Sequence, residues 1–199
     1  MPPTIPWHAA ALELSRLLAE RGGRIIGITG PVGAGKSTLA ARLSSCVVST
    51  DHYLPNYDDI PYERRDEPDA ADLPRLVRDL ASLAAGLPTR IPVWSFQTHR
   101  REGETLIHPP AEAPIVCEGL HALHEPVASS LHLRVFVDAP ASIRWARWEH
   151  LEVTGVRGWG PKVAREFFDA VAEPTFNRWL LTLRAAADVI VTNDEGVPG

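Results

Sequence analysis

Short apolar runs alternate with longer stretches of helical periodicity along the chain. Apolar, β-branched runs of strand length occupy residues 24–29, 46–50, 91–95, 114–117, 133–137 and 188–192. Apolar positions three and four residues apart predict helices at residues 7–21, 36–45, 73–85, 141–151, 161–172 and 175–186. This alternation predicts a mostly parallel sheet with helices on both faces. Ligands of such sheets bind beyond the carboxyl ends of the strands, so the residues after each strand are the first candidates for a site.

Composition narrows the class of protein. The chain has 199 residues, of which 45% are hydrophobic and 23% charged, and we expect one globular domain over residues 1–199. No apolar run approaches the roughly eighteen residues of a membrane helix, and the N-terminus lacks the pattern of a signal peptide. We therefore expect a cytoplasmic protein with no membrane partner. Cys46 and Cys117 lie in apolar runs, which favours buried, reduced thiols.

Charge argues against one class of partner. The net charge is −5 and no long basic run occurs, so we expect no nucleic-acid partner. The composition leaves a homo-oligomer open. His121 and His124 have helical spacing but no third ligand nearby, so no zinc site is expected. The tryptophans at 145, 148 and 179 fall in predicted helices and are expected to cover the core.

The segment GPVGAGKS at positions 30–37 matches G-x-x-x-x-G-K-[ST] in full, between a predicted strand and a predicted helix. The glycines allow backbone N–H groups to surround phosphate oxygens, and the positive end of the helix faces the same place. Lys36 can reach the β- and γ-phosphates, and the Ser37 hydroxyl can ligate magnesium. The residues expected to bind ATP are Gly30, Pro31, Val32, Gly33, Ala34, Gly35, Lys36, Ser37 and Thr38.

Two predicted strands end in a carboxylate. The second ends in Ser49-Thr50-Asp51, and the fourth continues into Glu118. Asp51 could accept a proton from an attacking hydroxyl, and Glu118 could orient magnesium or its water. A helix cap or a solvated turn is the structural alternative for both residues.

Five segments in order resemble the uridine kinase and phosphoribulokinase group of P-loop kinases, uridine-cytidine kinases above all. They are the P-loop, STDHY at 49–53, DEPDAAD at 66–72, PVWSFQTHRR at 92–101 and EGLHAL at 118–123. The resemblance runs from about residue 24 to about residue 193. It implies a three-layer α/β P-loop NTPase fold of the nucleoside kinase type. It also implies a mostly parallel five-stranded sheet, a β-hairpin near the substrate and a mobile lid.

The resemblance also implies roles for single residues. Asp51 corresponds to the catalytic aspartate, Asp66 to the residue that holds the nucleoside ribose, and Glu118 to the glutamate associated with magnesium. His99 and Arg101 correspond to residues that contact the substrate. Family members usually have tyrosine where this chain has Trp94, which we expect to border the substrate. Apart from Ser37 and Glu118, no metal ligands are expected.

The predicted lid departs from the family pattern. Arg157 keeps the first arginine of an R-G-R element and is expected to neutralise charge on the transferred phosphoryl group, but the second arginine is replaced by Trp159. An R-D pair appears here as Glu152-Val153. The preceding helix offers two further arginines, 144 and 147, for which a lid role and a surface role stay open.

Together these features predict an ATP- and magnesium-dependent kinase of a small-molecule hydroxyl, in particular the 5′-hydroxyl of a pyrimidine nucleoside such as uridine or cytidine. Other acceptors stay open, namely pantothenate, a sugar or sugar phosphate, or nicotinamide riboside. An ATP-dependent switch protein is the alternative of a different class. It gives no purpose to Asp51 or to the segment around Asp66.

Overall fold

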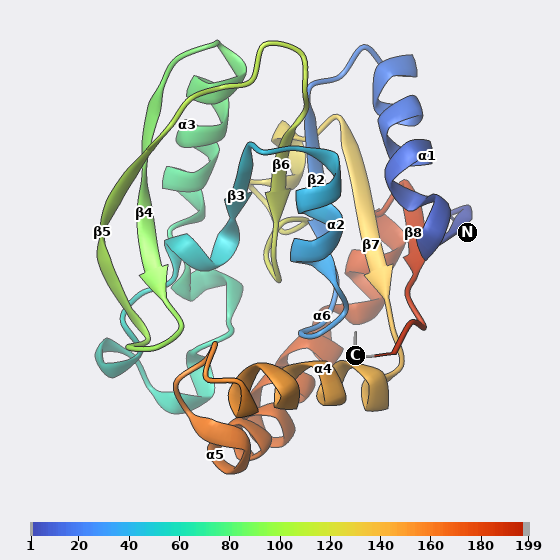
Figure 1. Cartoon of the computed structure of the whole chain (residues 1–199). Coiled ribbons are helices and arrows are strands. Elements are labelled where there is room, and N and C mark those ends of the chain that lie inside the picture. The colour runs from blue at the N-terminus through green and yellow to red at the C-terminus, as the bar shows by residue number, and fades with distance from the viewer. Residues whose placement is uncertain (1, 197–199) are drawn as a thin grey trace.

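The computed structural model describes residues 2–196, and its centre is a six-stranded sheet in the order β1-β8-β7-β2-β6-β3. Every neighbouring pair in this sheet is parallel. The strands are β1 (Thr4–Pro6), β2 (Ile25–Thr29), β3 (Val47–Ser49), β6 (Ile115–Glu118), β7 (Leu133–Asp138) and β8 (Val189–Thr192). Their carboxyl ends therefore lie at one edge of the sheet (Figure 1).

Helices cover both faces of the sheet and thus form three layers. One face packs against α1 (Trp7–Glu20) and α2 (Lys36–Leu43), and the other against α3 (Leu73–Ala84) and α6 (Glu173–Ala186). The helices α4 (Ala141–Val153) and α5 (Gly160–Phe167) lie across the carboxyl edge (Figure 1). None of the helices between residues 2 and 196 has the length and apolarity needed to cross a membrane.

The apolar runs form strands because both of their faces are covered. All five residues of β2 are buried. Ile25 packs with α3, whereas Ile26 and Ile28 pack with α1 and α2, as the period of two along a strand requires. The core is thus divided by the sheet into separate clusters, and the P-loop that follows β2 is anchored in the middle of the molecule.

The α/β fold class is confirmed, with three differences in detail. The sheet has a sixth strand, β1, which was not predicted because its three residues are too few to carry a strand pattern and one of them is a proline. The predicted strand at 91–95 belongs to β4 (Thr89–Ser95), which pairs antiparallel with β5 (Arg100–Ile107) in a separate hairpin. β5 is polar and almost wholly exposed, so its own residues give no periodic signal. The predicted helix 161–172 is α5 followed by a π-helical turn at Phe168–Ala172.

Candidate active site

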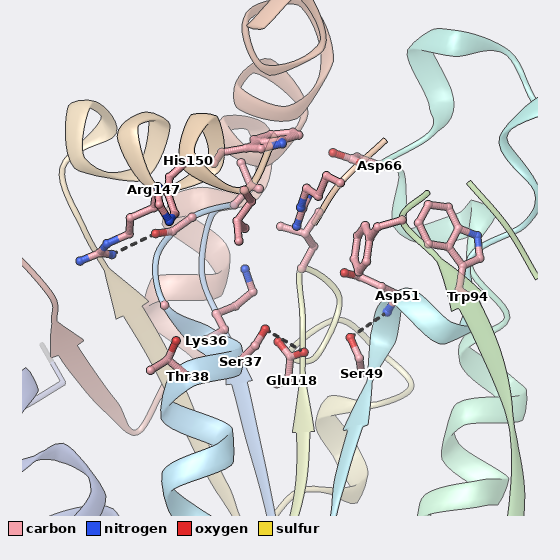
Figure 2. A pocket seen from close by; sticks show the side chains of 18 of the residues that line it. Lys36, Ser37, Thr38, Ser49, Asp51, Asp66, Trp94, Glu118, Arg147 and His150 are labelled. Carbon is pink, nitrogen blue, oxygen red and sulfur yellow. Dashed lines mark hydrogen bonds between the residues drawn. The ribbon is translucent and has the colours of Figure 1, made fainter. Parts of the chain in front are cut away.

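A cavity of about 750 Å³ lies at the carboxyl edge of the sheet. Its walls come from the P-loop, the segment after β3, the turn of the β4–β5 hairpin and the α4–α5 connection (residues 154–159). Figure 2 shows Lys36, Ser37 and Glu118 on the P-loop side, with Asp51, Asp66 and Trp94 facing them across the cavity. The structure therefore brings residues from segments far apart in the sequence to one site.

The P-loop ends at Gly35, whose backbone requires glycine. Gly35 is the N-cap of α2 with φ of 101°, and a Cβ there would lie 2.4 Å from Asn193 Nδ2. The next residue, Lys36, is buried, and its Nζ donates a hydrogen bond to the Pro31 carbonyl at 3.0 Å. Burial lowers the pKa of Lys36, while Glu118 and Asp51 oppose that shift. The ammonium group thus lies between the loop and two carboxylates.

Six of the predicted ATP-binding residues line the cavity, and three do not. The lining residues are Val32, Gly33, Gly35, Lys36, Ser37 and Thr38. Ala34 is buried in the core between α1 and α2, and Pro31 contributes its carbonyl to Lys36. Gly30 has φ of 151°, and a Cβ there would lie 2.3 Å from the Val137 carbonyl oxygen. These three residues therefore support the conformation of the loop from the side that faces away from the cavity.

Ser37 and Glu118 form the candidate magnesium site. The Ser37 hydroxyl donates to Glu118 Oε1 at 3.2 Å. Burial and the nearby Asp51 raise the pKa of Glu118, and Lys36 opposes this rise. The described residues contain no cluster of three or more acidic, histidine or cysteine side chains that could hold a metal ion. One hydroxyl and one carboxylate nevertheless fit Mg²⁺, which usually takes one or two protein oxygens and completes its shell with phosphate and water.

Two aspartates face the P-loop from the opposite side. Asp51 follows β3, and its backbone N–H donates to the Ser49 hydroxyl at 3.3 Å. Asp66 is 8% exposed, and it accepts a hydrogen bond from the Tyr57 hydroxyl at 3.3 Å. Burial, and then the charge of Asp51, raise the pKa of Asp66 to about 7. Asp66 therefore titrates near neutral pH.

Aromatic rings enclose the part of the cavity beyond these aspartates. Trp94 and His99, which the family resemblance assigns to the substrate, line this part of the cavity, and Trp94 Nε1 donates to the Pro55 carbonyl at 3.2 Å. The His99 ring is stacked on Trp159, with centroids 4.1 Å apart and planes 8° apart. Burial and the charges of Arg157 and Arg65 lower the pKa of His99 to about 4. His99 is therefore neutral at pH 7 and has one donor and one acceptor nitrogen.

Arg157 lies over two aromatic rings at the border of this aromatic region. Its guanidinium carbon is 4.3 Å from the Phe96 ring centroid and 5.0 Å from that of Trp148. Burial lowers the pKa of Arg157, and Asp51 and Glu152 are the main opposing charges. Arg157 therefore lies where its charge can act on groups bound between the P-loop and Asp51.

Arg101 lies elsewhere than we expected. Its guanidinium donates to the backbone carbonyls of Leu54 at 2.8 Å and Tyr53 at 2.7 Å, and the residue is absent from the cavity lining. It thus connects β5 to the segment that carries Asp51. Its position two residues after His99 explains the difference, because the extended strand carries it past the turn that faces the cavity.

The two arginines of α4 brace the P-loop. Arg144 is buried, forms a two-bonded ion pair with Glu173 and donates to the Val32 carbonyl. Arg147 donates to the carbonyls of Gly33 and Ala34, at 3.0 and 3.2 Å, and to Asn193 Oδ1 at 2.9 Å. Both guanidinium groups therefore hold loop carbonyls, and only Arg147 also lines the cavity.

Several lining residues were missed or misassigned from the sequence. No sequence pattern identified Tyr57, because it lies in a segment of short 3-10 turns without apolar periodicity. Trp148 was expected in the core, and its buried indole also lines the cavity. Trp7 and Asn193 line the end of the cavity near Gly35. A search for aromatic and polar residues next to strand ends would have found Asn193, which follows β8.

The strand, glycine loop and helix, together with carboxylates facing the loop, define this chain as a P-loop phosphotransferase. The sequence profile of the phosphoribulokinase / uridine kinase family matches residues 62–192. The chain belongs to this family. It is therefore a kinase that transfers a phosphoryl group from ATP to an alcohol group.

Relatives of known name extend the match to the P-loop half of the chain. The uridine kinase of Deinococcus deserti is 32% identical over 180 residues, which cover 84% of this chain and 86% of that one. The uridine kinase of Lactobacillus helveticus is 29% identical over 181 residues, with 84% and 85% covered. The chloroplastic uridine/cytidine kinase of Arabidopsis thaliana is 27% identical over 180 residues, which cover 84% of this chain and 37% of that protein.

Two solved structures share the fold. A candidate fructose transport system kinase from Silicibacter sp. TM1040 gives a TM-score of 0.67 at 18% identity, covering 89% of this chain and 97% of the other. A possible uridine kinase from Bacillus stearothermophilus gives a TM-score of 0.62 at 16% identity, covering 90% and 99%. At these identities the similarity establishes the fold alone.

Proposed function

We propose that this protein, acting as one domain, phosphorylates the 5′-hydroxyl of a pyrimidine nucleoside, uridine or cytidine, with Mg-ATP. The observation that carries the proposal is the arrangement of the cavity. Lys36 and Ser37 line one side, Asp51 and Asp66 line the other, and a neutral His99 lies within an aromatic wall. Phosphate, sugar hydroxyl and base thus each have a matching set of side chains.

The P-loop side binds the phosphates. The backbone N–H groups of the loop and the N-terminus of α2 face the phosphates, and Lys36 balances their charge. Ser37 and Glu118 are the side chains that would hold Mg²⁺, which neutralises charge on the β- and γ-phosphates when it is bound. Arg157, in the α4–α5 connection, adds a positive charge. This charge stabilises the transferred phosphoryl group while its bond to ADP breaks.

The acceptor side orients the attacking hydroxyl. Asp51 accepts the proton of the 5′-hydroxyl as its oxygen attacks the γ-phosphorus in line and ADP leaves. Asp66 accepts hydrogen bonds from the remaining ribose hydroxyls. His99 offers a donor and an acceptor to the edge of the base, and Trp94 closes the pocket beside it. The large indole narrows the pocket and so favours a single-ring base.

One observation favours a second acceptor. The aromatic rings of Tyr57, Trp94 and Trp159 lie close together near the carboxylate of Asp66. Such a wall attracts a flat cation, because the faces of aromatic rings are negative. Nicotinamide riboside carries a positively charged ring on the same ribose and would use the same Asp51 and Asp66.

A coupled assay of ADP release over a panel of acceptors tests the proposal. The panel contains uridine, cytidine, purine nucleosides, nicotinamide riboside, pantothenate and free sugars. We expect uridine or cytidine to give the highest kcat/KM, because the narrowed pocket excludes a two-ring base. Turnover of pantothenate or a sugar without turnover of any nucleoside would contradict the nucleoside assignment. ATP hydrolysis that no acceptor stimulates would instead favour a switch protein.

A further inference from the structure

Glu152 is a buried carboxylate on α4 outside the predicted site. It is 5% exposed. Its Oε1 accepts a hydrogen bond from Trp148 Nε1 at 2.9 Å. Its Oε2 accepts from the backbone N–H groups of Trp159 at 3.1 Å and Gly160 at 2.9 Å. A buried charge is tolerated only when it is compensated, and here the N-terminus of α5 and Arg157 compensate it.

The residues that Glu152 contacts lie next to Arg157, one of them in space and the others in the sequence. Trp148 supplies one of the two rings that the Arg157 guanidinium covers. The indole N–H of Trp148 donates a hydrogen bond to Glu152, which fixes that ring. The backbone two residues after Arg157 is held by the other oxygen of Glu152. Among the described residues, no hydrogen bond satisfies the guanidinium of Arg157, so its N–H groups remain free to donate to a bound phosphate.

We propose that Glu152 is a positioning residue for phosphoryl transfer. It fixes Trp148 and the start of α5 together, and through them it aims Arg157 at the transferred phosphoryl group. Glu152 itself does not line the cavity. This inference rests on the proposed role of Arg157, but it is independent of which acceptor the enzyme uses.

The variant Glu152→Gln separates positioning from bulk packing. Glutamine keeps the volume and can still accept from Trp148, but it loses the charge and one of the two acceptor oxygens. If the amide oxygen of the glutamine faces Trp148, its NH2 group faces the N–H donors of Trp159 and Gly160. If the oxygen faces those donors instead, the hydrogen bond to Trp148 is lost. We expect kcat to fall about tenfold or more, with less change in the KM for ATP, because small displacements of a charged group cost rate more than ground-state binding.

The decisive experiment is a double-mutant cycle with Arg157→Ala. The single and double variants are compared by kcat and KM, using the acceptor with the highest turnover in the panel. Glu149→Gln, on the exposed side of the same helix, is the matched control and is expected to keep full activity. If Glu152 acts through Arg157, Glu152→Gln should cause almost no further loss of kcat once Arg157 is alanine.

Each other result has a definite meaning. Equal losses of kcat with and without Arg157 would overturn the proposal and leave Glu152 a purely structural residue. No effect of Arg157→Ala would remove Arg157 from the proposed mechanism and this inference with it. If Glu152→Gln fails to fold, Trp148→Phe replaces it, because phenylalanine keeps a ring under Arg157 but cannot donate to Glu152. An unchanged kcat in that variant would also overturn the proposal.

Discussion

At the scale of single residues, neighbouring charges decide the chemistry of the site. Lys36 is buried beside Glu118 and Asp51, and Asp66 is buried beside Asp51. The charges of Glu118 and Asp51 oppose the lowering of the Lys36 pKa by burial, and the charge of Asp51 adds to the rise in the pKa of Asp66. Asp51 is the member that both follows a strand end and faces the P-loop, so it is the candidate base.

The variant Asp51→Asn tests that assignment. Asparagine keeps the size and the hydrogen-bonding shape of the side chain but cannot accept the proton. We expect kcat to fall about a hundredfold or more with a modest change in the KM for ATP. Steady-state kinetics with the best acceptor measure this, with Asp59→Asn as a control at an exposed aspartate that bonds Asn56. A normal kcat with a raised acceptor KM would make Asp51 a binding residue.

At the scale of elements, the α4–α5 connection is joined to the hairpin turn. The N–H of Gly158 donates to the Phe96 carbonyl at 3.2 Å, and Gln97 Nε2 donates to the Gly155 carbonyl at 2.6 Å. Trp159 adds its stack on His99. The connection and the turn therefore together enclose the aromatic end of the cavity, which is the end we propose for the acceptor.

The variant Gly158→Ala should separate the two elements. A Cβ at this position would lie 2.5 Å from the Gln97 carbonyl oxygen, and backbone atoms cannot yield as a flexible side chain would. We expect the acceptor KM to rise and kcat to fall, together by about tenfold in kcat/KM. Val156→Ala, at an exposed position in the same connection, is the control. Wild-type kinetics in the glycine variant would show that these elements need not meet during turnover.

At the scale of the whole molecule, the fold buries carboxylates that the unfolded chain would expose to water. Asp66 is the main case, since its pKa rises from 3.8 to about 7 on folding. The folded state thus holds a proton that the unfolded state releases between about pH 4 and pH 7. The free energy of unfolding must therefore fall as the pH rises through this range.

Urea unfolding of the wild type and of Asp66→Asn at pH 5 and pH 8 tests this prediction. The wild type should lose roughly 2–3 kcal/mol relative to the variant over this interval, because one pKa unit corresponds to about 1.4 kcal/mol. Asp59→Asn should instead follow the wild type. Parallel curves for wild type and Asp66→Asn would mean that Asp66 does not carry the proton.

Much of the fold, and the part of the site formed by the P-loop, Asp51 and Glu118, could be predicted from local patterns. Five central strands, the P-loop and the carboxylates Asp51 and Glu118 follow from runs of a few residues and from their order along the chain. Such patterns are readable because a buried parallel strand must be apolar throughout and a phosphate-binding turn must be rich in glycine. The family resemblance added Asp66, Trp94 and His99, all of which line the cavity.

The tertiary structure alone decided the rest, because it depends on contacts between distant segments. Tyr57 donates a hydrogen bond to Asp66 across a segment of irregular turns, and Arg101 donates to backbone carbonyls outside the cavity. Trp159 stacks on His99, which lies sixty positions earlier in the chain. The three donors that surround the Glu152 carboxylate are also visible only in the folded chain. The sequence by itself determined the chemistry of phosphate binding, since that chemistry is local. The shape of the aromatic end of the cavity is not local, and only the packing of the hairpin against the α4–α5 connection could determine it.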